Sequence, residues 1–225
     1  MSKPGEASAA GRQVEAQRTR SPRGQGRQLR AELMQAVGEL LDERLRSPDL
    51  NLSLREVARH TGIATQSVYL HFPSKESLAY AVAEEGYREL VKQMQNADAD
   101  GGSAADRLRA QAHAFIRFAQ ANRGVFRLMF GQDVSQLDPK QPAHPGEQLW
   151  LQWVSVMRDC ETDGRSWPSG AEVAAQDLWS ALLGRFVLWS TTFARDTETD
   201  IAIFADHVVD RQLIELDSPE RGSAT

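Results

Sequence analysis

Apolar residues recur at helical spacing along much of this 225-residue chain. The first such segment runs from Arg27 to about Arg46 and has apolar positions at Leu29, Leu33, Val37, Leu40, Leu41 and Leu45. Residues three and four positions apart share one face of a helix, so this spacing predicts an amphipathic helix. The sequence Ser47-Pro48-Asp49 ends it, because the residue before a proline disfavours helical backbone.

The remainder of the chain also predicts helices. Two short helices and a long one follow residue 53, and further helices are expected over about 103–121, 123–130, 146–160, 170–195 and 197–216. Ser103 with Asp106, and Ser169 with Glu172, have the spacing of capping boxes at helix starts. Alternating apolar and polar positions with hairpin turns are absent from the sequence, so the fold class predicted is all-α.

A segment near the N-terminus predicts a helix-turn-helix. Ser53 can cap a first short helix, and Glu56 can reach back to the amide of Ser53. Gly62 suits a turn that needs a positive φ. Ile63 and Val68 supply the apolar side of a second short helix. Two short helices joined by a turn containing glycine place the second helix in the major groove of DNA.

The residues from Thr61 to Leu78 resemble the recognition helix and the next helix start of TetR-family repressors. The matching positions are Tyr69, His71, Phe72, Ser74, Lys75 and Glu76. The resemblance covers about residues 27–85. It implies an N-terminal three-helix helix-turn-helix DNA-binding domain and a larger helical ligand-binding and dimerisation domain. The domains expected are a disordered basic tail (1–26), the DNA-binding domain (27–80), the effector-binding and dimerisation domain (81–217) and a disordered C-terminus (218–225).

The resemblance also assigns roles within the helix-turn-helix. Thr65, Gln66 and Ser67 match positions that read base edges, and glutamine is suited to adenine. Contacts to phosphates, which fix register, are expected from Ser53, Tyr69, His71 and Lys75. The amides that open the helices after Ser53 and Ser74 can also meet phosphates. Phe72 is expected to pack inside the domain, and an alternative role for His71 is a helix-end cap without a DNA contact.

The C-terminal part is expected to form a homodimer that binds a pseudo-palindromic double-stranded DNA operator. Apolar faces on the last two helices can make a four-helix interface, with residues Leu178, Leu182, Phe186, Trp189, Ile201, Phe204, Val208 and Leu213. A small apolar effector would bind among aromatic and sulfur-containing residues, chosen here as Phe115, Phe118, Met129, Trp150, Trp153, Phe186 and Trp189. Polar groups such as His113 or Gln152 are candidates for the same cavity. The alternative is that these residues form only core.

Charge is divided unevenly along the chain. Residues 1–80 carry 12 Lys+Arg against 9 Asp+Glu, and residues 81–225 carry 14 against 22, within a net charge of −5. A modestly basic end suits phosphates, and the acidic remainder does not. Arginines of the tail, such as Arg18 and Arg23, are candidates for a DNA-contacting arm; the alternative is a solvated leader without a role.

Other functional classes are less well supported by the sequence. Neither an apolar run of transmembrane length nor a secretory signal is present, so the expected location is the cytoplasm. The single cysteine, Cys160, is expected to be a small core or surface residue, with a reactive thiol as the alternative. Motifs for a phosphate-binding loop, a dinucleotide site, a hydrolase nucleophile or a zinc site are absent, so neither enzymatic activity nor a cofactor is expected. The remaining alternative is a helical scaffold or partner-binding protein that has lost DNA binding.

Overall fold

The computed structural model describes residues 25–44, 52–98, 102–131, 144–161, 165–191 and 198–217. The elements in these segments are helices: α1 (Gln25–Glu43), α2 (Leu54–Thr61), α3 (Thr65–His71), α4 (Lys75–Asp98), α5 (Ala104–Ala121), α6 (Arg123–Phe130), α7 (Glu147–Asp159), α8 (Ala171–Thr191) and α9 (Glu198–Asp217). The prediction of an all-α fold is therefore confirmed. Among the described helices, none is long and apolar enough to cross a membrane.

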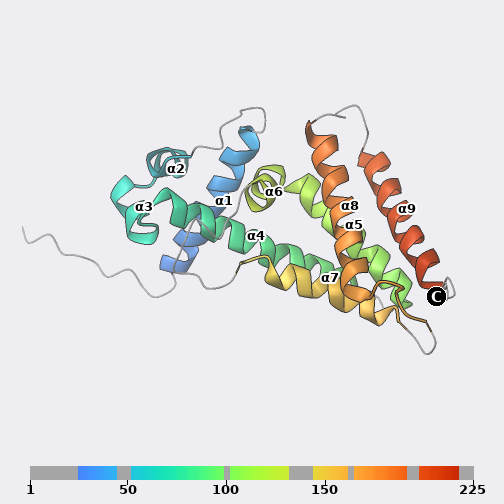
Figure 1. Ribbon diagram of the computed structural model, residues 1–225. Helices are drawn as coiled ribbons and strands as arrows, with labels where there is room; N and C mark the ends of the chain where they lie inside the picture. Colours follow the sequence, from blue (N-terminus) through green and yellow to red (C-terminus); the bar gives the residue numbers. More distant parts are fainter. Residues whose placement is uncertain are drawn as a thin grey trace, which may run out of the picture.

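Helices α1 to α3 form a small head at one end of the molecule (Figure 1). Their core is made by fully buried apolar side chains from each helix, including Leu33, Leu41, Leu54, Val57 and Val68. Helix α4 begins beside α3 and continues into the rest of the molecule, packing on α5, α6 and α7. The predicted domain boundary at residue 80 therefore falls inside one continuous helix.

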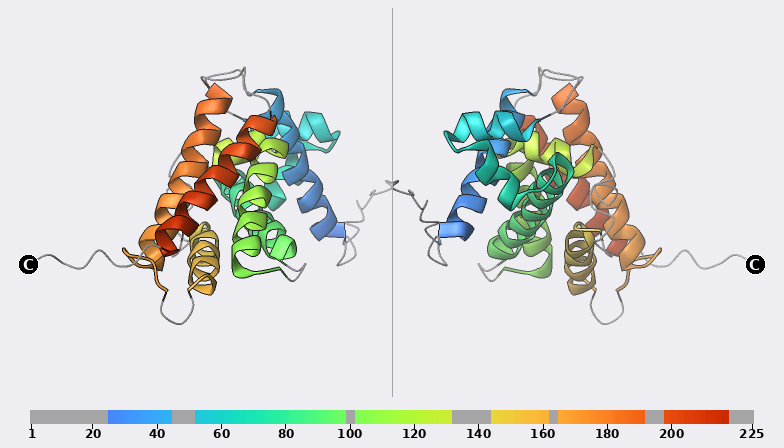
Figure 2. Two further views of the ribbon diagram at one scale, coloured as in Figure 1. Left: turned by 90° about the vertical axis from the view of Figure 1, so that its right-hand side faces the viewer. Right: turned by 90° about the vertical axis from the view of Figure 1, so that its left-hand side faces the viewer.

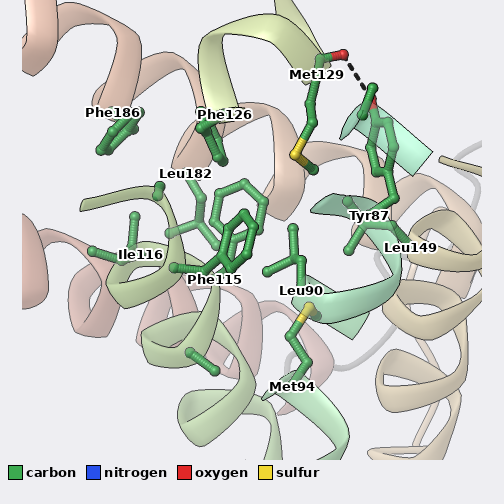
Figure 3. Close-up of a cluster of buried hydrophobic side chains, with 14 of the residues drawn as sticks. Tyr87, Leu90, Met94, Phe115, Ile116, Phe126, Met129, Leu149, Leu182 and Phe186 are labelled. Atoms are coloured by element: carbon green, nitrogen blue, oxygen red, sulfur yellow. Dashed lines mark hydrogen bonds between the residues drawn. The ribbon is translucent and has the colours of Figure 1, made fainter. Parts of the chain in front are cut away.

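The larger body contains α5 to α9 around the second half of α4. Its core joins aromatic and aliphatic side chains from α4 to α8, including Leu90, Phe115, Phe126, Leu149 and Leu182 (Figure 3). Helices α8 and α9 lie side by side at the end of the molecule away from α3 (Figures 1 and 2). The same chain thus presents the head at one end and this helix pair at the other.

Most predicted helix bounds lie within a few residues of the observed ones. Helix α1 starts at Gln25, so Gln25 and Gly26 belong to it and not to the predicted tail. The remainder of that tail, residues 1–24, and the predicted C-terminal tail lie outside the described residues, as do 45–50 and 192–197 at two predicted helix ends. The Ser103–Asp106 capping box is confirmed. The Ser169 cap is wrong, because the amide of Ala174 donates to the carbonyl of Gly170 and thereby places the cap at Gly170, which has φ 85°.

Six of the eight residues predicted for the dimer interface belong to the core of the subunit. Leu178, Leu182, Phe186 and Trp189 of α8 are almost fully buried against neighbouring helices, as are Ile201 and Val208 of α9. Phe204 and Leu213 pack partly against the same core. Helical periodicity identifies an apolar face but does not say whether that face meets its own chain or a second one, so the prediction was wrong for these six residues.

Candidate nucleic-acid interface and ligand cleft

Ser53 begins the helix-turn-helix by capping α2. Its backbone is extended and its hydroxyl oxygen accepts a hydrogen bond from the amide of Glu56 at 3.2 Å. The Glu56 carboxylate, predicted to reach back to the Ser53 amide, accepts a bond from the Arg44 guanidinium. Arg44 follows α1, so this ion pair joins α1 to the first turn of α2. The cap therefore fixes where α2 starts, and the ion pair fixes its place against α1.

The turn between α2 and α3 depends on Gly62. This glycine has φ 69°, a left-handed conformation that side chains with a Cβ rarely adopt. The amide of Ile63 then donates to the carbonyl of Ala58 at 3.0 Å, closing the helix in the Schellman arrangement. The predicted turn is confirmed. It sets the direction in which α3 leaves α2.

Helix α3 has one buried and one exposed side. Val68 is fully buried and Phe72, at the end of α3, is 1% exposed, with the Arg30 guanidinium 4.5 Å from its ring centroid. The expectation that Phe72 packs inside the head is confirmed. On the opposite side, Tyr69 is 48% and Leu70 79% exposed. The structure therefore leaves a mixed polar and apolar surface on α3 facing away from the head.

The predicted base-reading residues all lie in the first turn of this helix. Gln66 is exposed, and Thr65 and Ser67 are partly exposed. His71 ends the helix and is partly exposed. Leu70 was not among the predicted residues, although its position four residues after Gln66 places it on the same face. The structure thus brings the predicted residues together on one surface and adds a leucine to them.

The start of α4 contributes the remaining predicted phosphate contact. The Lys75 side chain is 54% exposed, and its ammonium lies 3.9 Å from the Glu76 carboxylate. Ser74 and Ser77 cap each other's amides, with distances of 3.1 Å from the Ser77 nitrogen to Ser74 Oγ and 3.2 Å from the Ser74 nitrogen to Ser77 Oγ. These two amides therefore already have acceptors at this helix end.

A cleft of about 550 Å³ opens in the body between α4, α6, α7 and α8. The described residues that line it are Tyr87, Met129, Phe130, His144, Trp150, Gln176, Trp179, Ser180 and Leu183. Met129 and Trp150 are among the predicted effector-binding residues. The other five predicted residues, Phe115, Phe118, Trp153, Phe186 and Trp189, are at most 6% exposed and pack in the core.

Sequence analysis missed Tyr87, Trp179 and Leu183 as cleft residues. Trp179 and Leu183 are four residues apart on α8, and with Gln176 and Ser180 they form one helical face. This face is separate from the buried face that carries Leu178 and Leu182. The apolar spacing along α8 identifies both faces, but only the placement of α6 and α7 shows that the face with Trp179 and Leu183 borders the cleft.

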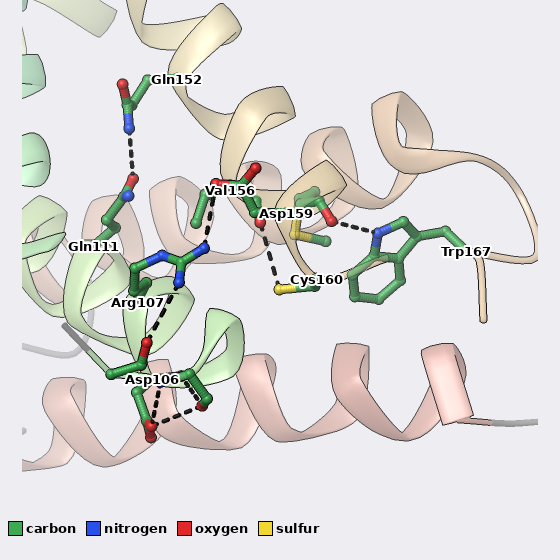
Figure 4. Close-up of polar contacts among 11 residues, drawn as sticks. Asp106, Arg107, Gln111, Gln152, Val156, Asp159, Cys160 and Trp167 are labelled. Atoms are coloured by element: carbon green, nitrogen blue, oxygen red, sulfur yellow. Dashed lines mark hydrogen bonds and ion pairs between the residues drawn. The ribbon is translucent and has the colours of Figure 1, made fainter. Parts of the chain in front are cut away.

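The two polar candidates proposed for the cavity have other partners. Gln152 donates to Gln111 at 3.0 Å (Figure 4) and accepts from Gln95 at 3.0 Å, which links α4, α5 and α7. His113 Nε2 lies 2.8 Å from Asp206 on α9. Both side chains therefore connect helices of the body.

Helix α6 connects the head to the cleft. At its first turn the amide of Gly124 donates to the Asp42 carboxylate of α1 at 2.6 Å. A Cβ at Gly124 would lie 2.5 Å from the backbone carbon of Leu41, so only glycine permits this approach. At the other end of α6 the Tyr87 hydroxyl donates to the carbonyl of Met129 at 2.8 Å (Figure 3), and burial raises the pKa of Tyr87. One eight-residue helix therefore touches both α1 and the cleft wall.

Cys160 has the environment of an unreactive thiol. It is 3% exposed, its Sγ lies 3.4 Å from the carbonyl oxygen of Val156 (Figure 4), and burial raises the pKa of the thiol to about 11. Thiolates are the reactive form, so this environment suppresses reactivity. The core interpretation of Cys160 is confirmed.

Two family models match the chain. The model described as "Bacterial regulatory proteins, tetR family" matches residues 50–82, which contain the helix-turn-helix. The model described as "Tetracyclin repressor-like, C-terminal domain" matches residues 108–212. One match lies in the head and the start of α4, and the other lies in the body.

Solved structures share the fold at low sequence identity. A bacterial regulatory protein in the tetR family from Rhodococcus RHA1 is 23% identical, with a TM-score of 0.60 over 83% of this chain and 96% of that one. A TetR-like transcriptional regulator from Rhodococcus sp. RHA1 is 18% identical, with a TM-score of 0.61 over 87% and 99%. The transcriptional regulator FadR from Bacillus subtilis, solved in complex with stearoyl-CoA, is 12% identical, with a TM-score of 0.61 over 82% and 98%.

Proposed function

Since this chain is a transcriptional regulator of the tetR family, we propose that it represses transcription by binding a pseudo-palindromic operator as a homodimer and releases the DNA when a small apolar effector fills the cleft. The observation that carries the proposal is the exposed face of α3, which gathers hydrogen-bonding side chains at the free end of the head. The major groove is wide enough to admit such a helix.

On this proposal α3 reads bases and its surroundings hold phosphates. Gln66 can bond the N6 and N7 of adenine in a bidentate manner, and Thr65 and Ser67 can bond several base edges. We add Leu70 to these residues, because an exposed apolar side chain suits the methyl group of thymine. Phosphate contacts fall to Tyr69 and His71 in the later part of α3 and to Ser53 and Lys75 on the helices beside it, and these contacts fix its register.

Dimerisation is proposed through the exposed sides of α8 and α9. Val187 and Leu188 on α8, and Ile203 and Ile214 on α9, are large apolar residues left 44–66% exposed. Gly184 lies on the same side of α8, where a Cβ would meet nothing within 4 Å. A glycine inside a helix costs about 0.5–1 kcal/mol relative to alanine. No contact within the described part of the single subunit requires glycine at position 184. A close crossing of two α8 helices in a dimer would require it.

Release is proposed to pass through α6. This helix meets the cleft at Met129 and Phe130 and meets α1 at Gly124. An effector that favours one position of α6 shifts the balance between head positions that fit the operator and those that do not. Effector binding and operator binding then oppose each other.

The reading surface is tested by selecting duplexes from a random pool with the wild-type protein and measuring gel shifts on the enriched sequence. Gln66→Ala should weaken binding to that sequence by about 1–3 kcal/mol and relax the preference at particular bases. Lys75→Ala should weaken binding to all sequences and reduce the dependence on salt. Gln148→Ala and Lys92→Ala, which remove exposed residues of the body, are the matched controls and should bind as wild type.

The selection also separates the proposal from its alternative. A helical scaffold without DNA binding would enrich no sequence above competitor duplex. A uniform loss from Gln66→Ala, without a change in base preference, would remove this residue from the reading surface.

A further inference from the structure

The wall of the cleft is largely aromatic. Tyr87 and Phe130 meet edge to face with ring centroids 5.4 Å apart, and Phe130 meets Trp179 in the same way at 6.1 Å. Trp150 lies 6.4 Å from Trp179 with the ring planes inclined by 31°. These rings come from α4, α6, α7 and α8, and they present both edges and faces. Aromatic rings pair favourably in edge-to-face and offset stacked arrangements, so this wall suits a ligand that is itself aromatic.

The described lining residues include neither Lys, Arg, Asp nor Glu. A ligand carrying phosphates or a carboxylate would have to bury its charge there without a guanidinium or ammonium partner, which is unfavourable. Arg88 and Lys92 line a neighbouring groove that shares His144 with the cleft, and there they pair with carboxylates of the same helix. The cleft therefore favours an uncharged ligand.

One described residue of the cleft wall carries a buried hydrogen-bond donor without an acceptor, in addition to the polar side chains of Gln176 and Ser180. The proton of the Tyr87 hydroxyl is committed to the carbonyl of Met129, and Nδ1 of His144 accepts a bond from the amide of Gly146 at 3.0 Å. The indole N–H of Trp179, in contrast, is buried and lacks a hydrogen-bond partner within the described structure. Buried donors are normally satisfied, so an unsatisfied donor on a cleft residue needs an explanation, and a bound acceptor is one.

We propose that the effector is an uncharged aromatic compound whose carbonyl or ether oxygen accepts a hydrogen bond from the Trp179 indole. The proposal rests on the proposed function in that it names the ligand class of the same cleft. It distinguishes this chain from the Bacillus subtilis FadR, which was solved with stearoyl-CoA. The aromatic wall supplies the contact area, and the unpartnered indole donor selects ligands that carry an acceptor.

Two probes that differ only at the acceptor test this class. Benzophenone is a neutral aromatic ketone, and diphenylmethane has a methylene group in place of its carbonyl. Equilibrium dialysis against the full-length protein should give saturable binding of benzophenone and weaker binding of diphenylmethane. Trp179→Phe keeps a ring but removes the donor, and it should weaken benzophenone binding about tenfold while leaving diphenylmethane unchanged. Trp189→Phe, which replaces a tryptophan outside the cleft, is the matched control and should change neither.

A second variant locates the site independently of Trp179. Leu183→Trp fills part of the cleft from a partly exposed position on α8 and should weaken both probes. Unchanged binding in this variant would overturn the assignment to the cleft. Equal losses of both probes in Trp179→Phe would overturn the role of the indole donor.

Palmitoyl-CoA serves as the charged competitor. Saturable binding of palmitoyl-CoA without binding of benzophenone would overturn the proposed ligand class, as would binding of neither. Dialysis is carried out without DNA, whereas operator binding is measured by gel shift. A failure of the regulator function therefore leaves the dialysis result interpretable, and a failure of the ligand class leaves the gel shift unaffected.

Discussion

The hydroxyl oxygen of Ser53 satisfies one of the amide donors that every helix leaves open at its start. Gly62 and Phe72 have equally definite tasks, in the turn and in the core of the head. All three roles were predictable from sequence, because capping, positive φ and apolar spacing are local rules. The roles of Tyr87 and Trp179 were not, because they depend on which helices meet around the cleft.

Removing the Ser53 cap should destabilise the head. We expect Ser53→Ala to lower the free energy of unfolding by about 1 kcal/mol, since alanine cannot accept the bond from the Glu56 amide. Urea denaturation followed by circular dichroism measures the change. Ser155→Ala, at an exposed position inside α7, is the control and should alter stability by less than about 0.5 kcal/mol. Equal effects of both substitutions would contradict the capping role.

At the scale of elements, helix positions were predictable and helix pairings were only partly so. The bounds of α5, α6 and α7 agree with the apolar spacing and turn residues to within one residue. The contact of α6 with α1 was not predicted, because it depends on Gly124 meeting Leu41 and Asp42, which are more than 80 positions away in the sequence. The local sequence pattern of neither helix predicts this contact between α6 and α1.

The hydrogen bond from α6 to α1 should be measurable on its own. Asp42→Ala removes the acceptor for the Gly124 amide and should lower the free energy of unfolding by about 1–2 kcal/mol. Asp42→Asn keeps a carbonyl oxygen in the same place and should lose less. Chemical denaturation of the two variants and the wild type gives the comparison. If asparagine and alanine cost the same, the acceptor is not what holds this contact.

A second contact between elements should depend on pH. Asp206 on α9 accepts bonds from Arg109 at 3.1 Å and His113 at 2.8 Å, and Arg109 also donates to Asp210 at 2.7 Å. Burial acts to raise the pKa of Asp206, but the bonds from His113 and Arg109 outweigh burial and lower it below 3.8. A carboxyl whose pKa is lowered by folding stabilises the protein above its unfolded pKa, and this contribution is lost as the pH falls through the folded value.

We therefore expect Asp206→Asn to destabilise the protein at pH 7 and to make the loss of stability below about pH 4 shallower. Urea denaturation at neutral pH and at several values in the acid range measures both effects. Asp177→Asn, at an exposed position of α8, should leave the acid profile unchanged. An unchanged profile in Asp206→Asn as well would show that the contact between α5 and α9 does not depend on this carboxylate.

On the scale of the whole molecule, the head and the α8–α9 pair lie at opposite ends (Figures 1 and 2). The division into a reading head and a helical body was predictable from the helix-turn-helix residues and the family resemblance. The surface through which we propose that two copies meet was not, because the strongest apolar spacing on α8 and α9 belongs to the subunit core.

The proposed dimer can be broken at Gly184. Arginine is a good helix former and a Cβ at this position meets open space, so Gly184→Arg should leave the subunit folded. It should nevertheless prevent the close approach of a second α8. Light scattering is expected to give the mass of one subunit for this variant and of two for the wild type. Ser155→Arg on α7 is the matched control, and a dimeric Gly184→Arg would place the interface elsewhere.

The alkylation rate of Cys160, the single cysteine of the chain, can report how often the body of this regulator opens. With a pKa of about 11 and 3% exposure, Cys160 is shielded from alkylating reagents until α7 moves away from its neighbours. Because the chain carries no other thiol, each alkylated molecule records one such opening event. A compound bound in the cleft should slow the alkylation rate, whereas a compound bound only at the head should leave it unchanged. Mass spectrometry of the wild-type protein during alkylation would therefore distinguish the two kinds of ligand without a mutation or a dye.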